Sequence, residues 1–442
     1  MMTTYPVERL VCRMAVPSII IMMVSAMYNM ADTFFVGSLG TADTAAVGIS
    51  FSLMAIIQAV GFFFGHGSGN YIARALGARN NRNAEKMAAV GFFSAFVAGV
   101  LIALTGLLFL SPFARLLGAT DTILPHTRSY LRFILIGAPF MVSSLTLNNL
   151  LRFQGSAFWG MIGMTGGAVL NVGLDPLFIF VLDMGITGAA LATMISQTVS
   201  CTLLFVVSAA GKNNLRIRLR SFRPGLGVYR DILRGGIPSL LRQALLSLAT
   251  IFLNHAAGGF SDAVIAAVSI VNRITLIAGA ALLGLGQGFQ PVCGFNYGAG
   301  RYDRVKGAFW FCLRLATVLL VLMAVGGFAA APDIIALFRR DDSEVIRVGA
   351  AALRFQCYAF PLTGWIVLNG MMLQTIGRAV PASVMAFARQ GIFLIPLLFL
   401  LTPGLGILGI QLCGPLADIC TFILSLPLGI RALRQMKTAR RM

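Results

Sequence analysis

The segment from Ala15 to Gly37 reads AVPSIIIMMVSAMYNMADTFFVG and holds one charged side chain, Asp32, among apolar and small residues. A stretch of about 20 apolar residues is long enough to cross a bilayer as a helix, so we predict that this segment spans a membrane. A carboxylate inside such a helix is costly unless it has partners. Asp32 is therefore a candidate functional residue.

Apolar segments of this length recur along the whole chain. Of its 442 residues, 58% are hydrophobic and 11% are charged, which is far more apolar than a soluble domain. We predict an all-α integral membrane protein with twelve transmembrane helices. The predicted spans are residues 15–37, 45–74, 86–110, 124–150, 157–182, 186–210, 236–257, 264–293, 305–330, 346–373, 379–402 and 406–430.

The net charge of +19 raises the question of nucleic-acid binding. The basic residues are spread over short loops at every second connection between the predicted spans, so we predict no nucleic-acid partner and a bilayer as the surroundings. Loops rich in Lys and Arg stay in the cytoplasm, which places both termini there. The seven cysteines show no metal-binding spacing.

The second half of the sequence repeats the first at an offset of half the chain length. Six spans per repeat is an even number, so both copies cross the membrane in the same direction, as a parallel repeat. The predicted parts are an N-terminal six-helix bundle (1–210), a cytoplasmic basic linker (211–235), a C-terminal six-helix bundle (236–430) and a cytoplasmic basic tail (431–442). Matching pairs include Pro17-Ser18 with Pro238-Ser239, Gly77-Ala78 with Gly298-Ala299, Gly155 with Gly377 and Gly185-Ile186 with Gly406-Ile407.

Two similar bundles suit alternating access, in which the halves rock about a site between them, and this favours a transporter. The sequence shows neither His-Glu-x-x-His nor Gly-x-Ser-x-Gly, so we predict that the protein is not an enzyme and uses no cofactor. A non-transporting membrane scaffold is the alternative from another class, but it would need a soluble signalling region that the sequence does not show. Nothing in the sequence demands an oligomer, and we expect a monomer.

Three further polar residues fall at the depth of Asp32. A rise of about 1.5 Å per residue puts Asp175 at a similar height in the fifth span, Asn171 one turn deeper on the same face, and Thr193 nearby in the sixth span. These oxygens suit a hard cation such as Na⁺, and two buried carboxylates can equally exchange a proton. The repeat places Leu253 opposite Asp32, so we predict the site in the first bundle alone.

Other polar residues in the spans have weaker assignments. Arg389 and Asp418 lie at comparable depth on adjacent spans, and we predict a structural ion pair. Pro17 lacks a backbone donor and is predicted to bend its helix. The candidates for lining a substrate cavity between the bundles are Met27, Tyr28, Gln58, Asn272, Arg273, Gln287 and Arg389.

Three motifs resemble the multidrug and toxic compound extrusion (MATE) transporters, and the likeness covers nearly the whole chain. They are Met27 to Asp32 with Val36-Gly37 in the first span, Asn171 to Pro176 in the fifth, and Gly188 to Ala190 with Thr193 in the sixth. In the branch of that family with an amino-terminal cation site, the resemblance implies that Asp32, Asn171, Asp175 and Thr193 form the site. Pro17 similarly matches a proline at which the helix bends in some members.

The resemblance implies an antiporter of the bacterial plasma membrane that exports amphipathic, mostly cationic drugs while Na⁺ or protons enter. Residues 236–257 and 350–374 lack the acidic residues of NorM-type members, so the chain is more similar to the DinF-like or MepA-like side. The nearest alternative is a flippase for lipid-linked saccharides from the same superfamily. Such flippases usually have more than twelve spans and a cationic cavity.

Overall fold

The computed structural model describes residues 2–210, 215–339 and 342–438, and this part of the chain consists of helices and turns without a strand. Contacts divide it into two units. We call them the N-terminal unit (Val16–Leu240) and the C-terminal unit (Met1–Ala15 with Leu241–Met442). The predicted all-α architecture is confirmed.

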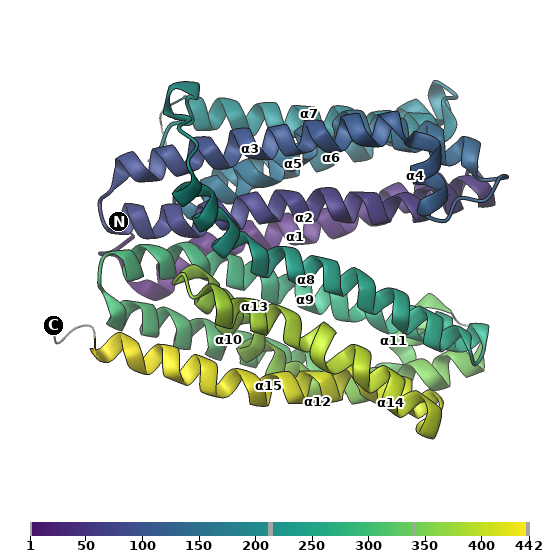
Figure 1. Ribbon diagram of the computed structural model, residues 1–442. Helices are drawn as coiled ribbons and strands as arrows, with labels where there is room; N and C mark the ends of the chain where they lie inside the picture. The colour runs from purple at the N-terminus through teal and green to yellow at the C-terminus, as the bar shows by residue number, and fades with distance from the viewer. Residues whose placement is uncertain (1, 211–214, 340–341, 439–442) are drawn as a thin grey trace. The chain divides into compact units, whose positions relative to one another are not determined.

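The described residues up to Gly258 form eight helices and two short turns of other helical types (Figure 1). They are α1 (Val7–Gly37), α2 (Thr41–Gly77), α3 (Asn81–Leu108), α4 (Leu110–Leu116), α5 (Leu124–Phe153), α6 (Ala157–Pro176), the π-helical η1 (Leu177–Val181), α7 (Gly185–Ala209), the 3₁₀ turn η2 (Leu219–Ser221) and α8 (Leu226–Gly258).

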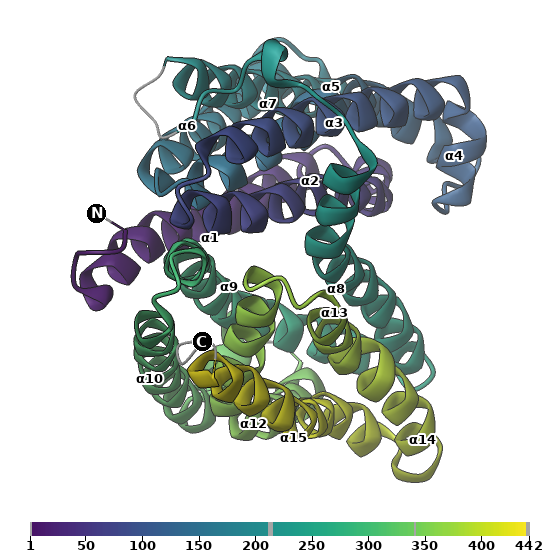
Figure 2. The ribbon, with the colours of Figure 1, turned by 60° about the vertical axis from the view of Figure 1, so that its left-hand side comes forward.

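The described residues from Asp262 onwards form seven helices and one π-helical segment (Figure 2). They are α9 (Asp262–Gly298), α10 (Tyr302–Ala329), α11 (Ala331–Phe338), α12 (Ser343–Thr375), α13 (Ala379–Phe387), the π-helical η3 (Ala388–Leu394), α14 (Ile395–Leu405) and α15 (Ile407–Thr438).

Among the described residues, eleven helical stretches are long and apolar enough to cross a membrane, counting α6 with η1 and α13 to α14 as single spans. The remaining predicted span, 346–373, lies in α12, which is 33 residues long. Gln356, Asn369 and Gln374 lower its hydropathy, but all three are buried in protein. Each of the twelve predicted spans therefore coincides with a helix.

The internal repeat is visible in the helix bounds. Helices α2 and α9 are both 37 residues long, and α3 and α10 are both 28 residues long. The short helices α4 and α11, which the sequence analysis did not predict, begin at Leu110 and Ala331, again separated by half the chain length. The turns after α5 and α12 contain Gly155 (φ 89°) and Gly377 (φ 84°), left-handed conformations that favour glycine.

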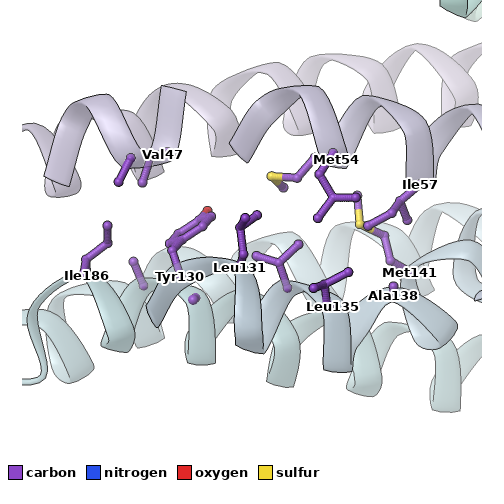
Figure 3. Packing of buried hydrophobic residues seen from close by; sticks show 14 of the residues in the cluster. Val47, Met54, Ile57, Tyr130, Leu131, Leu135, Ala138, Met141 and Ile186 are labelled. Atoms are coloured by element: carbon purple, nitrogen blue, oxygen red, sulfur yellow. The ribbon is translucent and has the colours of Figure 1, made fainter. Parts of the chain in front are cut away.

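One helix occupies the centre of each unit. In the N-terminal unit α5 packs against α2, α3, α4, α6 and α7. Figure 3 shows Leu131, Leu135 and Met141 of α5 meeting Met54 and Ile57 of α2. In the C-terminal unit α12 packs in the same manner against α9, α10, α11 and α15 (Figure 2). Equivalent segments of the repeat therefore have equivalent places in their units.

The N-terminal unit includes the start of α8. A Cβ atom on Gly67 of α2 would lie 2.5 Å from the carbonyl oxygen of Ile232, so the two backbones touch. Nearby, His66 Nδ1 is 3.0 Å from Ser239 Oγ, and His66 Nε2 is 3.2 Å from Arg152 Nη2. Because arginine only donates, Nε2 is the acceptor, and the neutral imidazole donates from Nδ1 to Ser239.

The C-terminal unit includes the first fifteen residues in the same way. A Cβ atom on Gly288 of α9 would collide with the backbone of Ala15. Asn296 Nδ2 donates to the Met2 carbonyl at 3.2 Å, and Arg301 Nη1 donates to the Thr3 carbonyl at 2.8 Å. The two contact glycines, Gly67 and Gly288, are themselves equivalent positions of the repeat.

The unit boundaries thus fall inside α1 and α8, beside the repeat prolines Pro17 and Pro238. Within the predicted linker, residues 211–214 lie outside the described part of the chain. Leu215 and Ile217 are buried in a core cluster of the N-terminal unit, and α8 has already begun at Leu226. Much of this segment is therefore packed against the N-terminal unit.

The predicted ion pair between Arg389 and Asp418 is present in the C-terminal unit. Arg389 Nε donates to Asp418 Oδ1, and Nη2 lies 3.2 Å from Oδ2. Gln356 Nε2 of α12 donates to the same Oδ2 at 2.9 Å. The Asp418 side chain is fully buried, whereas that of Arg389 is 31% exposed. One carboxylate therefore holds together η3, α12 and α15.

We predict that Gly67→Ala destabilises the protein because the added methyl group meets the backbone of Ile232. Overpacking of this kind costs about 1–3 kcal/mol, and the thermal midpoint of the purified protein in detergent measures it. The matched control is Gly48→Ala in the same helix, where nothing lies within 4 Å of the added atom. Equal midpoints for the two variants would contradict the close contact.

We also predict that Asp418→Ala lowers the thermal midpoint because it leaves the Arg389 guanidinium without its partner. Losing one member of a buried pair costs about 3 kcal/mol or more. The double variant Arg389→Met/Asp418→Leu is expected to recover part of this loss, since it leaves no unpaired charge. If the double variant is as unstable as both single variants added together, the ion pair is not the cause.

Candidate functional site

The structure brings the four predicted site residues together inside the N-terminal unit. Asn171 and Asp175 lie one turn apart on α6, where Asn171 Nδ2 is 3.4 Å from Asp175 Oδ1. The same Nδ2 is 3.3 Å from Thr193 Oγ1 on α7. Asp32 comes from α1, and all four side chains are at most 3% exposed. Asn171 thus links α6 to α7 through one amide group.

Several oxygen atoms at this site lack a hydrogen-bond partner within the described residues. They are Asp32 Oδ1, Asn171 Oδ1 and Asp175 Oδ2, and each is buried. Asp32 and Asp175 are close enough to interact electrostatically. Buried polar atoms normally have partners, so three unsatisfied acceptors in one place indicate room for a group that is itself positive or a donor.

The local sequence explains how these acceptors are presented. Asn171 and Asp175 stack because residues four apart share a helix face. Pro176 follows at once, and the helix continues as the π-helical η1. Such a widening often accompanies functional sites because it shifts the side chains around it. The chain then turns at Gly185 (φ 54°) to begin α7, which carries Thr193.

The donor set fits a hard monovalent cation. Carboxylate, amide and hydroxyl oxygens are ligands of hard cations, although the described residues contain no group of three or more His, Cys, Asp or Glu side chains that could hold a metal ion. In the same part of the chain, neither Asp32 nor Asp175 forms an ion pair with a basic side chain. The site can therefore accept Na⁺, or a proton shared by two carboxylates.

Tyr130 is a site neighbour that the sequence analysis missed. It belongs to α5, is fully buried, and its hydroxyl has no hydrogen-bond partner among the described residues. The charges of Asp32 and Asp175 both act on it. Figure 3 shows its hydroxyl pointing away from α5. From the sequence alone, a tyrosine in an apolar span is interpreted as a packing residue. Its interaction with the two carboxylates follows only from the central position of α5 in the unit.

A pocket adjoins the site and contains one of the predicted cavity residues. It is bounded by three helices of the N-terminal unit, α1, α6 and α7. Its lining is Ser25, Tyr28, Met164, Gly167, Ala168, Asn171, Thr193, Ser196, Gln197 and Ser200. Tyr28 also lies in the field of Asp32 and Asp175. Of the hydroxyl residues of α7 in this lining, Thr193 was predicted from the sequence, whereas Ser196 and Ser200 were not singled out.

The other candidate cavity residues belong to different helices of the two units. Met27 is 68% exposed on α1, and Gln58 is partly buried on α2. In the C-terminal unit, Asn272 and Gln287 are at least partly buried on α9, Arg273 is exposed, and Arg389 is engaged with Asp418. Pro17 lies within α1, which is a continuous helix at that point.

Comparison with known proteins gives similarity over nearly the whole chain. The multidrug export protein MepA of Staphylococcus saprophyticus is 28% identical over 398 residues, which is 90% of this chain and 87% of the relative. MepA of Staphylococcus aureus is 26% identical over 406 residues, covering 92% and 89%.

Solved structures match as well. The outward-facing conformation of a multidrug resistance MATE family transporter of the MOP superfamily superposes with a TM-score of 0.93 at 27% identity, covering 99% of this chain and 98% of that one. A MOP superfamily transporter from Pyrococcus furiosus, described as having a binding pocket of reversed polarity that suggests a different function, gives 0.91 at 28% identity, with coverage of 99% and 98%.

The model of the MatE family matches the chain twice, over residues 17–177 and 238–400. The two matches begin at the repeat prolines, Pro17 and Pro238, so each half of the internal repeat corresponds to one copy of the family model. Together they cover well over half of the chain. The protein therefore belongs to the MatE family.

Proposed function

We propose that this protein is a cation-coupled antiporter that exports amphipathic, mostly cationic drugs or toxic compounds. One observation supports the coupling most directly: Asp32 and Asp175 are buried with oxygens that lack partners among the described residues, whereas Asp418 in the C-terminal unit is neutralised by Arg389. A buried charge is costly unless it is paired. The unpaired carboxylates need a mobile positive charge, supplied by Na⁺ or a proton.

We propose a role for each residue of the site. Asp32 and Asp175 supply the negative charge from α1 and α6, and they repel each other when the site holds no cation. Asn171 donates its amide to Asp175 and Thr193, which leaves its own carbonyl oxygen free for the cation. Cation binding removes the repulsion and draws α1 towards α6, and cation release reverses this. This local change is the proposed link between occupancy of the ion site and alternating access of the transporter.

The substrate class rests on the relatives, two of which are named multidrug export proteins. We propose a bacterial plasma (inner) membrane location, cytoplasmic termini in keeping with the basic loops, and action as a monomer. No cofactor is required beyond the coupling ion. The alternative is a lipid-linked saccharide flippase of the same superfamily. Export of ethidium but not of such a lipid, assayed in the same vesicles, would favour the antiporter over both the flippase and a non-transporting scaffold.

The central test is ethidium efflux from a pump-deficient bacterial host carrying Asp32→Asn or Asp175→Asn. Each substitution keeps the shape but removes a charge, so we expect ion-driven efflux to fall at least about tenfold, equivalent to about 1.4 kcal/mol of lost ion binding. Proteoliposomes with separate Na⁺ and pH gradients then identify the coupling ion.

The matched control is Asp121→Asn, because Asp121 is 87% exposed and pairs with Arg115. This variant should transport like the parent. Ion-driven export that persists unimpaired in both Asp32→Asn and Asp175→Asn would overturn the proposed coupling site.

We further predict that Tyr130→Phe weakens cation binding. The buried hydroxyl lies in the field of two carboxylates and has no partner among the described residues. We expect it to serve the bound cation as an oxygen ligand, so its loss should raise the half-saturating concentration of the coupling ion about 3- to 10-fold. The control is Tyr358→Phe, since Tyr358 is 69% exposed in the C-terminal unit. An unchanged half-saturating concentration in Tyr130→Phe would show that the tyrosine only fills space.

A further inference from the structure

The pocket beside the carboxylates follows a line of hydroxyl groups along α7. Thr193, Ser196 and Ser200 are three and four residues apart, so they lie on one helix face. All three line the pocket, and all three are nearly fully buried. Neighbouring positions in a membrane helix are normally apolar, so a buried hydroxyl row that begins at a cation site needs a physical reason.

The three hydroxyls are not equivalent. Thr193 Oγ1 accepts from Asn171, and Ser200 Oγ donates to the carbonyl oxygen of Gly163 at 2.7 Å, which ties α7 to α6. Ser196 is 3% exposed, and its hydroxyl has no hydrogen-bond partner within the described residues. Ser200 thus has a packing role, whereas the Ser196 hydroxyl is buried, unsatisfied and on the wall of an open space.

A second unsatisfied oxygen belongs to another residue of the pocket lining. Asn171 lines the pocket, and its Oδ1 has no hydrogen-bond partner in the described part of the chain. Gly167 of α6 also lines it, and a Cβ atom there would lie 2.8 Å from the Ser200 Cβ. The absence of a side chain at Gly167 therefore lets α6 approach the hydroxyl face of α7 closely.

We propose that this pocket is a second cation position, formed by Asn171 Oδ1, Thr193 Oγ1 and Ser196 Oγ, through which the coupling ion passes between the carboxylates and the end of α7. This inference rests on the proposed function, because it extends the same ion path. Asn171 and Thr193 belong to both positions. Ser196 belongs to the second position alone.

The chemistry of neutral oxygens suits a transit position. Hydroxyl and amide oxygens replace part of the hydration shell of Na⁺ without the strong attraction of a carboxylate, so an ion can enter and leave. The same groups can hold a water molecule that carries a proton, since a hydroxyl both donates and accepts. Ser196 is one turn from Thr193 along α7, towards the end that the basic loops place in the cytoplasm.

The test compares Ser196→Ala with the parent in proteoliposomes, where ethidium export is measured against Na⁺ concentration at fixed pH and against pH without Na⁺. With the cation that drives the parent, we expect Ser196→Ala to raise the half-saturating concentration about fivefold, the usual scale for one lost oxygen ligand. Ethidium affinity of the purified protein without that cation should stay within about twofold.

Three further variants make the result specific. Ser208→Ala is the matched control, because Ser208 is a buried serine of α7 whose hydroxyl also lacks a partner among the described residues but does not line the pocket. Ser196→Thr keeps a hydroxyl and should behave like the parent. Ser196→Cys keeps the size of the side chain but replaces oxygen with sulfur. It therefore takes the place of Ser196→Ala in the test if the alanine variant is not produced in sufficient amount.

The outcomes separate this inference from the proposed function. A fivefold shift in Ser196→Ala or Ser196→Cys, absent from Ser208→Ala and Ser196→Thr, supports the second position. If the half-saturating cation concentrations of Ser196→Ala and Ser208→Ala are equal, the second cation position is overturned. The proposed function still stands in that case if Asp175→Asn has lost coupling in the same assay. If Asp175→Asn retains ion-driven export, the proposed function fails first.

Discussion

The interior of a bilayer offers neither hydrogen bonds nor screening, so every polar group at that depth must be satisfied by the protein itself. The two units meet this constraint in different ways. In the C-terminal unit, Arg389 and Gln356 satisfy the buried carboxylate of Asp418 permanently. In the N-terminal unit, Asp32 and Asp175 keep oxygens that no described residue satisfies. The first arrangement is a structural brace, and the second provides the unsatisfied oxygens on which the proposed cation coupling rests.

The duplicated architecture makes this contrast informative. Helices α2 and α9, like α3 and α10, have the same lengths and the same spacing, and α5 and α12 hold the same central place. A framework shared this closely does not itself demand the Asp32 carboxylate, because Leu253 stands at the position of Asp32 in the second copy. The polar site was therefore added to, or kept on, one copy of a common scaffold.

Much of this could be predicted from the sequence because membrane helices have strong signals. Length, apolarity and the constant offset between matching positions revealed the twelve spans and the repeat, and helical spacing brought Asn171 and Asp175 to one face. What escaped prediction depends on packing between helices. Tyr130 and Ser196 look ordinary in an apolar sequence, and their role follows only from which helices surround them. The short helices α4 and α11 were missed because they are not long enough to span.

The first residues of α1 belong to the C-terminal unit, whereas the rest of α1 belongs to the N-terminal unit. This division has a consequence for the order in which the protein is assembled. Residues 2–15 leave the ribosome before the rest of the described chain, yet their partners include Gly288, Asn296 and Arg301, which are made only in the second half. This early segment can therefore form these contacts only after that part of the second half has been synthesised. Folding of the first half can therefore be completed only after the second half has been synthesised. The two copies of the repeat thus depend on each other during assembly.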